Sequence, residues 1–546
     1  MLNRDIVQSL PHCASLHQIQ GSRSTVPVLV AYPSLHACPL NDTMILHTLS
    51  IDLVTVGVVL LTVALLVQAL GNSRMATVPV LGTTAFFGYL TALKSQTSIT
   101  EFLKAGYEKY KSRPFQLPAL RAWIIYVAGE QIQDLWKGRD DTFSLKEEVN
   151  DLIELQYTLG PSIANDHWHA SVIRRQMTQN LAAKFPELYE EIQRAFLDEL
   201  NLPANGEWQE VKAAEVFTRV ICRVSNRLFI GFPLCRDERF TELSRDFTLD
   251  ASTAAVILSC FPSFVKPMVL RYLTRIPSTI KEFAKYIIPI IEERQRQEVL
   301  GDGWNDKKPF DFLQWMLDAA RGSQRDPKDL NLRMINVNFT AIHTSSMSFT
   351  QAFYWLAAHP EYTPALRMEI EAAVTQLGWT KDAINAMVKV DSFLKESMRV
   401  TGIGASSMGR KVMRPITLSD GTKVPKGAHL AANLYGVHRD PKIYERPDEF
   451  DPWRFSKRVD AGESATRHAL TTATPDFLFW GGGAHPCAGR HFASLEMKAM
   501  IAHIVLNYDV KLPRDGVRPK DIWFGASCIP NQTAAVLFRL RQTRAG

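Results

Sequence analysis

The residue with the strongest chemical context in the sequence is Cys487. It follows a glycine-rich segment, residues 481–483, and Pro486, and it precedes a stretch with helical periodicity. Glycines let a backbone approach a large flat ligand closely, and the proline restricts the chain that enters the cysteine. A cysteine at a helix N-terminus meets the positive end of the helix dipole, which favours the thiolate over the thiol. Because the thiolate is a strong metal ligand, we expect Cys487 to bind a metal.

Segment 480–499 has two other interpretations, namely a turn that holds a buried cysteine and a glycine-rich cradle for phosphate. It has neither G-x-G-x-x-G spacing nor a Walker lysine, which argues against the phosphate cradle. The seven cysteines of the chain are odd in number, widely spaced and never in a C-x-x-C pair. This argues against a disulfide scaffold and the usual zinc sites, and it favours a reducing compartment. The remaining cysteines are expected to be small buried hydrophobes: Cys13, Cys38, Cys222, Cys235, Cys260 and Cys528.

Three further segments carry polar side chains in patterns that mean little alone. Glu396 and Arg399 are three residues apart, so a helix places them on one face. Arg454 lies in a Pro-Trp-Arg-Phe run at 452–455. The run Thr-Ala-Ile-His-Thr-Ser at 340–345 lies inside a long apolar stretch. Hydroxyls in the middle of a helix usually bond back to the preceding turn, so this run is not evidence of a site by itself.

Together the four segments resemble the cytochrome P450 family, and they occur in that family's order. The haem-binding loop of the family has the form F-G-x-G-x-R-x-C-x-G. The family also has an E-x-x-R pair, a P-x-R-F element, and an oxygen-binding segment of the form A/G-G-x-D/E-T-T/S. At the loop positions this chain has Trp480, Gly481, Gly483, His485, Cys487 and Gly489. Trp480 in place of phenylalanine and His485 in place of arginine are departures from the family pattern.

The resemblance implies that haem b is the cofactor, with Cys487 as the axial ligand of its iron. The Trp480 ring is expected to pack beside the thiolate, with its N–H bonded nearby, and His485 is expected to bind a haem propionate. Further candidates for the propionates are Arg174, Arg410 and His438.

The resemblance also assigns roles to the other segments. Glu396, Arg399 and Arg454 are expected to form a buried cluster that locks the fold behind the haem loop, since burying any one of them unpaired would be costly. In the oxygen-binding segment, Thr344 and Ser345 are the hydroxyl residues that assist proton delivery, and His343 stands where the family has an acidic residue. Its side chain is expected to shuttle protons or to contact the substrate.

The implied activity is mono-oxygenation of a lipophilic small molecule with O2. Electrons are expected to come from NADPH through a separate NADPH-cytochrome P450 reductase, with cytochrome b5 as a further partner, because the chain shows no flavin or nicotinamide site. The sequence as a whole is similar to fungal members of the family that oxidise terpenoids or meroterpenoids in secondary metabolism. An indole alkaloid or a polyketide is the alternative substrate. A haem-thiolate isomerase or dehydratase is an alternative activity, and a haem sensor or a degenerate fold without catalysis is a non-enzymatic one.

These residues must be positioned by a mainly helical domain with a small β-sheet portion, which is the cytochrome P450 fold. We predict strands at 122–129 and a hairpin within 415–434 around an Asp-Gly turn. Residues 98–546 are expected to form the catalytic domain, after a linker at 73–97. Helices are predicted at 98–111, 145–158, 168–196, 207–230, 278–300, 330–359, 363–377, 388–400 and 490–507.

The N-terminal part contains an uncharged apolar run at 53–70, long enough to cross a bilayer core. We predict a single transmembrane anchor at 45–72, preceded by an extension at 1–44 that is disordered or upstream of the true start at Met44. The sparse positive charge after the run places the domain in the cytosol, on the endoplasmic reticulum. The apolar stretch 257–272 is expected to dip into the membrane surface. A net charge of +6 over 546 residues is too small to suggest nucleic-acid binding.

Overall fold

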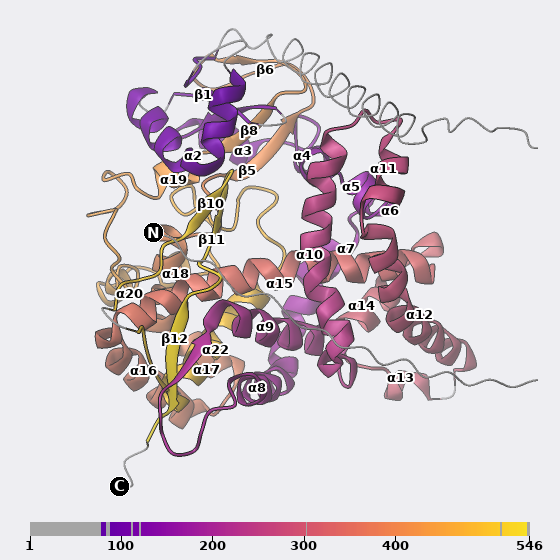
Figure 1. The fold of residues 1–546 in the computed structure, drawn as a ribbon, viewed down its shortest axis with the longest axis vertical. Coiled ribbons are helices and arrows are strands. Elements are labelled where there is room, and N and C mark those ends of the chain that lie inside the picture. Colours follow the sequence, from indigo (N-terminus) through magenta and orange to yellow (C-terminus); the bar gives the residue numbers. More distant parts are fainter. Residues whose placement is uncertain are drawn as a thin grey trace, which may run out of the picture. The chain divides into compact units, whose positions relative to one another are not determined.

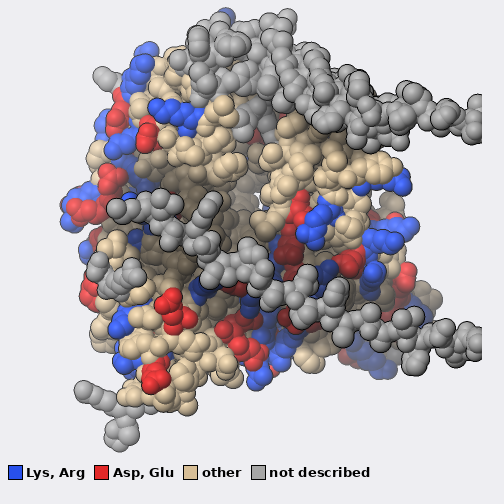
Figure 2. All heavy atoms as spheres, viewed as in Figure 1, with Lys and Arg blue, Asp and Glu red and all other residues tan. Residues whose placement is uncertain are grey.

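The computed structural model describes residues 78–82, 88–110, 113–119, 122–301, 303–513 and 516–542. The predicted extension at 1–44 and the predicted anchor at 45–72 lie outside these residues. Among the helices that the structure describes, none has the length and apolar character needed to cross a bilayer. Figure 2 shows Lys, Arg, Asp and Glu intermixed over the lower part of the visible face, so charge of one sign does not dominate there.

Helices dominate the described chain, as the sequence predicts (Figure 1). The longer ones are α2 (Gly88–Tyr110), α8 (Thr178–Leu200), α9 (Ala213–Phe229), α10 (Glu238–Ser259), α12 (Ile276–Leu300), α15 (Pro327–Ala358), α16 (Thr363–Leu377), α18 (Val388–Val400) and α22 (Arg490–Asn507). The shorter ones are α3 (Gln131–Lys137), α4 (Leu145–Ile153), α5 (Leu155–Thr158), α6 (Pro161–Asn165), α7 (His169–Val172), α11 (Lys266–Leu273), α13 (Trp304–Lys307), α14 (Phe312–Ala319), α17 (Lys381–Ala386), α19 (Leu434–Val437), α20 (Ser456–Asp460) and α21 (Ala465–His468). A π-helical turn, η3 (Ile173–Met177), joins α7 to α8.

The strands form small sheets at the edge of this helical body. The largest sheet has the order β1-β2-β8-β5-β3, in which β2 and β8 run parallel and the other pairs antiparallel. Its members are β1 (Phe115–Pro118), β2 (Trp123–Val127), β3 (Phe143–Ser144), β5 (Ser407–Val412) and β8 (His429–Ala432). The smaller sheets contain β4 (Gln209–Lys212), β9 (Tyr508–Lys511) and β12 (Ala535–Leu540), then β6 (Ile416–Thr417) with β7 (Lys423–Val424), and β10 (Ile522–Phe524) with β11 (Ser527–Ile529). The predicted hairpin around the Asp-Gly turn is β6–β7.

The 32-residue helix α15 crosses the middle of the molecule in Figure 1. It begins after Asp326, whose side chain accepts a hydrogen bond from the Lys328 N–H, and Pro327 occupies the first turn. It packs against α9, α10, α12, α18 and α22. Phe217 of α9 lies 4.8 Å from Phe349 and 4.6 Å from Phe353 between ring centroids, so aromatic contacts hold α9 on α15. The central helix is therefore fixed on several sides.

The structure differs from the sequence prediction at three places. Helix α2 begins at Gly88, ten residues before the predicted start, and Ser98 is a kink inside it. The predicted helix at 145–158 is split at Glu154, which has a φ of 51°. The predicted helix at 207–230 begins as strand β4, because residues 209–212 pair with β12 near the C-terminus. Pairing between segments this far apart in the chain overrides local helix propensity.

Candidate functional site

The loop before α22 places Cys487 at the N-terminus of that helix, as predicted. The Cys487 N–H donates to the Trp480 carbonyl oxygen at 2.7 Å, which closes the loop on itself. Gly489 is the N-cap residue of α22. Burial raises the pKa of the Cys487 thiol above its usual value, whereas the backbone N–H groups of Gly489 and Arg490 and the positive charges of Arg490 and Arg174 act to lower it. The helix terminus and two guanidinium groups thus offset part of the cost of desolvating a thiolate.

The Cys487 side chain is exposed to solvent, although protein surrounds it on most sides. Desolvation is the largest influence on this thiol and raises its pKa, against the N–H groups and charges. A side chain that water can reach while protein desolvates it lines a recess rather than an outer surface. At Gly489 no atom lies within 4 Å of where a Cβ would stand, so the loop leaves room beside the cysteine.

The glycines of the loop are explained mainly by Trp136 on α3. A Cβ on Gly482 would lie 2.0 Å from the Trp136 ring, and a Cβ on Gly483 would lie 2.3 Å from the Trp136 carbonyl oxygen. Gly481 and Gly483 also have φ values of 71° and 67°, which side chains with a Cβ rarely adopt. From the sequence, the glycines at 481–483 are expected to allow the close approach of a flat ligand. At Gly482 and Gly483 the structure gives a different reason for glycine, which is packing against α3.

The Trp480 ring is buried beside the loop, as expected of an aromatic residue at this position. Its indole N–H donates to the Leu470 carbonyl oxygen at 2.7 Å. That bond ties the loop to the segment before it. The ring of Phe479 meets Trp480 edge to face, with centroids 4.8 Å apart.

One face of α15 is open in a helix that is otherwise largely buried. Thr340 and Thr344 are exposed, one helical turn apart, whereas Ser345 is 5% exposed and Ile342 is fully buried. The Thr344 hydroxyl donates to the Thr340 carbonyl oxygen at 2.7 Å. The structure thus places Thr344 at an open position and Ser345 in the packed part of the helix.

His343 does not share the open face with Thr344. Its Nε2 lies 2.8 Å from the Arg245 carbonyl oxygen, so the ring donates to the backbone of α10. Burial lowers the pKa of His343, which keeps the imidazole neutral at neutral pH. In this structure the side chain joins α15 to α10, and its expected role in proton transfer or substrate contact stays a prediction.

The structure brings Glu396, Arg399 and Arg454 together in a buried cluster. Arg399 donates to both Glu396 carboxylate oxygens at 2.8 Å, and Arg454 Nε lies 3.0 Å from Oε1. The remaining guanidinium N–H groups donate to backbone carbonyls of the segment 438–449. Because each buried charge has a partner, the cluster fixes that segment on α18.

Two of the residues predicted to bind haem propionates lie close to the same carboxylate. His485 Nε2 contacts Asp140, and the charge of Asp140 also acts on the guanidinium of Arg410. Arg410 is buried, which lowers its pKa, and it donates to the Gly409 carbonyl oxygen at 2.7 Å. Asp140 was not predicted, and no motif in the sequence singles it out.

The other two propionate candidates differ from each other. Arg174 lies on η3, is exposed, and is close enough to Cys487 for its charge to lower the thiol pKa. His438 is fully buried: its Nδ1 donates to the Arg399 carbonyl oxygen, and its Nε2 accepts from the Leu478 N–H. Both ring nitrogens of His438 are therefore hydrogen-bonded to the protein backbone, and the bond to Leu478 supports the segment that leads into the Cys487 loop.

Comparison with known protein families shows to which family the chain belongs. The model of the family described as Cytochrome P450 matches residues 82–538. The chain belongs to the cytochrome P450 family. It is 36% identical over 90% of its length to cytochrome P450 monooxygenase 103 of Postia placenta, covering 99% of that protein. Cytochrome P450 monooxygenase CYP512U6 of Ganoderma lucidum is 32% identical, with 83% of this chain and 89% of that protein aligned. Ent-kaurene oxidase P450-4 of Gibberella fujikuroi is 30% identical, with 88% and 95% aligned. The chain is thus a cytochrome P450 monooxygenase.

The residues present fit a haem bound through a thiolate. The Cys487 thiol reaches a recess, its thiolate is stabilised by N–H groups of α22, and the loop leaves room at Gly489. Arg174 offers an exposed positive charge near the cysteine. We expect Cys487 to hold the iron, and Arg174, Arg410 and His485 to face the propionates.

Sequence reasoning missed several residues that shape the P450 site. Arg490 follows Cys487 by three residues, and its positive charge lowers the pKa of that thiol. Its closeness in the sequence was the only signal that could have identified it. Lys395 is buried, donates to the His468 and Ala469 carbonyl oxygens, and lies 4.7 Å from the ring centroids of Phe455 and Phe477. Burial lowers the pKa of Lys395 to about 8. Nothing in the local sequence distinguishes this lysine from a surface lysine.

Proposed function

We propose that this P450 monooxygenase oxidises a terpenoid or meroterpenoid intermediate of fungal secondary metabolism. The observation that carries the proposal is an apolar surface on α10, α11 and the turn between them, where large hydrophobic side chains are exposed. They are Val256, Phe264, Met268, Tyr272 and Leu273, with 53%, 83%, 63%, 70% and 60% of their surface exposed. A surface of this kind suits contact with a membrane that holds a lipophilic substrate. The likeness to a protein named ent-kaurene oxidase supports the terpenoid class.

Cys487 and Thr344 have separate roles in the proposed reaction. Haem with a thiolate ligand supplies O–O cleavage and oxidation of an unactivated C–H bond when it is bound. Cys487 would hold the iron through its thiolate, and Thr344 would hold water and protons at the open face of α15. The overall change puts one atom of O2 into the substrate and releases the other as water. It uses two electrons from NADPH and two protons from solvent.

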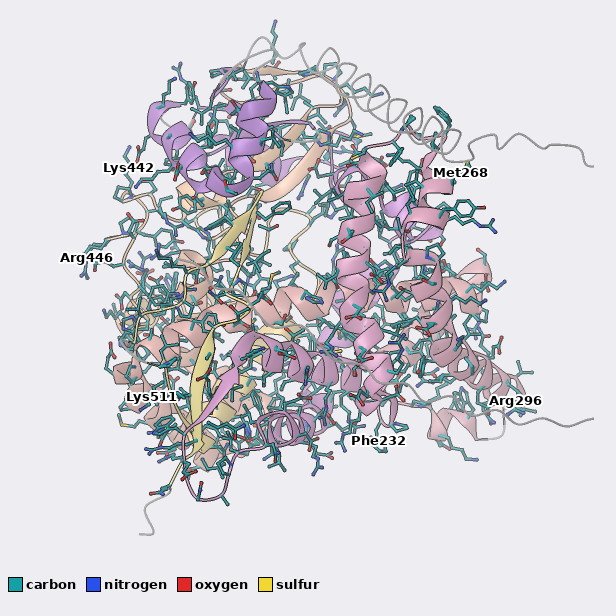
Figure 3. The ribbon with its side chains drawn as sticks, viewed as in Figure 1. Phe232, Met268, Arg296, Lys442, Arg446 and Lys511 are labelled. Atoms are coloured by element: carbon teal, nitrogen blue, oxygen red, sulfur yellow. The ribbon has the colours of Figure 1, made fainter. Side chains whose placement is uncertain are left out.

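The proposal includes a membrane location and an electron donor. We infer an endoplasmic reticulum anchor at 45–72 with the catalytic domain in the cytosol, where NADPH-cytochrome P450 reductase and cytochrome b5 supply electrons. Lys442 and Arg446 project outward from the segment that packs on the Glu396 cluster (Figure 3), and they are candidates for contacts with an acidic partner.

The substrate class is tested with the full-length enzyme co-expressed with a reductase. The panel contains ent-kaurene, other terpenoid scaffolds, an indole alkaloid and an aromatic polyketide, under isotopically labelled O2. We expect labelled oxygen in a terpenoid product, detected by mass spectrometry. Labelled product from the alkaloid or the polyketide alone would contradict the proposed class.

The role of Thr344 is tested by Thr344→Ala. Loss of the hydroxyl should raise the peroxide released per NADPH by at least about twofold, because general acid–base assistance to the reaction is lost. Thr350→Val is the matched control, since Thr350 is a buried hydroxyl on the same helix that bonds back to the Ser346 carbonyl. If Thr344→Ala and the control release equal peroxide, Thr344 has no part in proton delivery.

A further inference from the structure

The open face of α15 carries a second hydroxyl besides that of Thr344. Thr340 and Thr344 are both exposed, whereas Val337 and Ser348 on the same helix are buried. Side chains four residues apart on a helix stand one above the other, with ~5–6 Å between Cβ atoms. Thr340 and Thr344 therefore face the same open space.

The hydrogen bonds of the two threonines leave both oxygens free to accept. Thr340 Oγ1 donates to the Asn336 carbonyl oxygen at 3.0 Å, and Thr344 Oγ1 donates to the Thr340 carbonyl oxygen at 2.7 Å. A hydroxyl has one hydrogen and two lone pairs, so each oxygen can still accept a hydrogen bond from water. One water with two hydrogen bonds spans up to ~5.6 Å, which suits neighbours one turn apart.

The segment differs from the family pattern at Thr340, Ala341 and His343, and the first and last of these changes alter the polar groups. The family segment A/G-G-x-D/E-T-T/S has a small residue without a hydroxyl where this chain has Thr340, and an acidic residue where it has His343. The structure turns His343 to the Arg245 carbonyl oxygen on α10, 2.8 Å away. The Nε2 of His343 is therefore hydrogen-bonded to α10 and not to Thr344. Compared with the family pattern, the segment lacks a carboxylate at position 343 and has an additional hydroxyl on the open face, at Thr340.

We propose that Thr340 is a positioning residue for proton delivery, which holds one water jointly with Thr344 and takes over from the missing acidic residue. The inference rests on the proposed function of Thr344. Because both hydroxyl hydrogens are directed to the helix backbone, the water donates one hydrogen to each threonine oxygen. Its lone pairs then face the open space, where they accept a proton from the next solvent molecule.

The proton transfer balances without any further reactant. In the transfer, the water accepts a proton from the next solvent molecule through a lone pair, one of its two hydrogen bonds to the threonines opens, and the proton released from that bond passes towards the reacting centre, so the water is restored. The two protons that mono-oxygenation consumes enter by this route. Neither threonine changes its charge, and no group in the helix needs to ionise.

The test compares variants of the full-length holoenzyme reconstituted with reductase. Thr340→Val removes the hydroxyl but keeps the shape, Thr340→Ser keeps the hydroxyl, and Thr350→Val is the control for a buried hydroxyl on the same helix. We expect Thr340→Val to raise peroxide released per NADPH at least about twofold. Thr340→Ser and the control should behave as wild type. All variants should show the same reduced carbon monoxide spectrum, which shows that the haem site is intact.

A crystal structure of the haem-loaded protein gives a second readout, independent of activity. We expect an ordered water within ~3 Å of both Thr340 Oγ1 and Thr344 Oγ1 in wild type, and no such water in Thr340→Val. The inference is overturned if no water bridges the hydroxyls, or if Thr340→Val leaves peroxide release unchanged while Thr344→Ala raises it. In that second case the proposed role of Thr344 stands. If Thr344→Ala also has no effect, the proposed role fails as well.

Discussion

The cysteines of this protein show how surroundings decide the chemistry of a single residue. Burial raises the pKa of the Cys222 and Cys528 thiols to about 12 and that of Cys235 to about 11, so these side chains are neutral core groups. Cys487 is also desolvated, but two backbone N–H groups and two guanidinium groups act in favour of its thiolate. The same residue type is inert in the core, and at the start of α22 it is the residue that we propose as the metal ligand.

Glu496 on α22 gives a prediction about pH at this scale. Its carboxyl is buried, accepts a hydrogen bond from Ser225, and has its pKa raised by burial to about 8. The folded protein therefore keeps a proton that the unfolded chain loses near pH 4.5. This stabilisation is complete below that pH and is lost as pH rises towards 8. Glu496→Gln should flatten the fall in Tm over this range and raise Tm by a few degrees, about 2–4 °C, at its upper end.

The matched control is Glu463→Gln, since Glu463 is an exposed carboxyl paired with His468 and has a lowered pKa. Differential scanning calorimetry at a series of pH values makes the comparison. A pH profile of Glu496→Gln that is as steep as that of wild type would mean that Glu496 is ionised in the folded protein.

At the level of elements, long helices with a clear apolar period were predictable. The helices at 363–377, 388–400 and 490–507 have the predicted bounds, and the helix at 388–400 carries the predicted pair Glu396 and Arg399. Strand β4 was not predictable, because its partner β12 lies more than 300 residues later in the chain. The orientation of the His343 side chain was also not predictable from the sequence, because it depends on how α10 packs across α15. Local patterns carry no information on such distant contacts.

The contact between the cysteine loop and α3 gives a prediction at the element scale. Gly482→Ala places a methyl group 2.0 Å from the Trp136 ring, so the loop or α3 must move. We expect the variant to bind less haem per protein and to unfold at a lower temperature, with a cost of ~1–3 kcal/mol. Haem content is measured by the pyridine haemochromogen absorbance.

A second substitution separates this clash from other causes. Trp136→Leu removes the ring, so Gly482→Ala should do little further harm in that background. Gly404→Ala is a control for the change of residue type, since the φ of Gly404 lies outside the left-handed region and an added Cβ would come no closer than 3.4 Å to another atom. If the loss of haem is the same with and without Trp136, the packing of α3 does not explain the glycine.

For the whole molecule, we propose that the apolar surface on α10 and α11 orients the catalytic domain on a membrane. Met268 projects outward from α11 at one end of the molecule, and Arg296 projects from α12 at a distance from it (Figure 3). If the surface that includes Phe264 and Met268 lies in the membrane, Arg296 should remain in water. The arrangement would let a lipophilic substrate enter from the bilayer.

This orientation is tested with the full-length protein in lipid nanodiscs. A fluorophore that is sensitive to its environment is attached to Met268→Cys or Arg296→Cys, in a Cys260→Ser background that removes an exposed thiol. We expect blue-shifted emission and quenching by brominated lipid at position 268, and neither at position 296. Equal, water-like emission at both positions would place the α11 surface away from the membrane.

The central claim is that Cys487 ligates the haem iron of this monooxygenase. It is tested most directly by the reduced carbon monoxide difference spectrum of the expressed protein, with Cys487→Ala beside it and Cys260→Ala as the matched exposed cysteine. We predict the red-shifted Soret band of a thiolate-ligated haem in wild type and in Cys260→Ala, and its loss in Cys487→Ala. A wild-type spectrum without that band, or a band that survives in Cys487→Ala, would contradict the assignment.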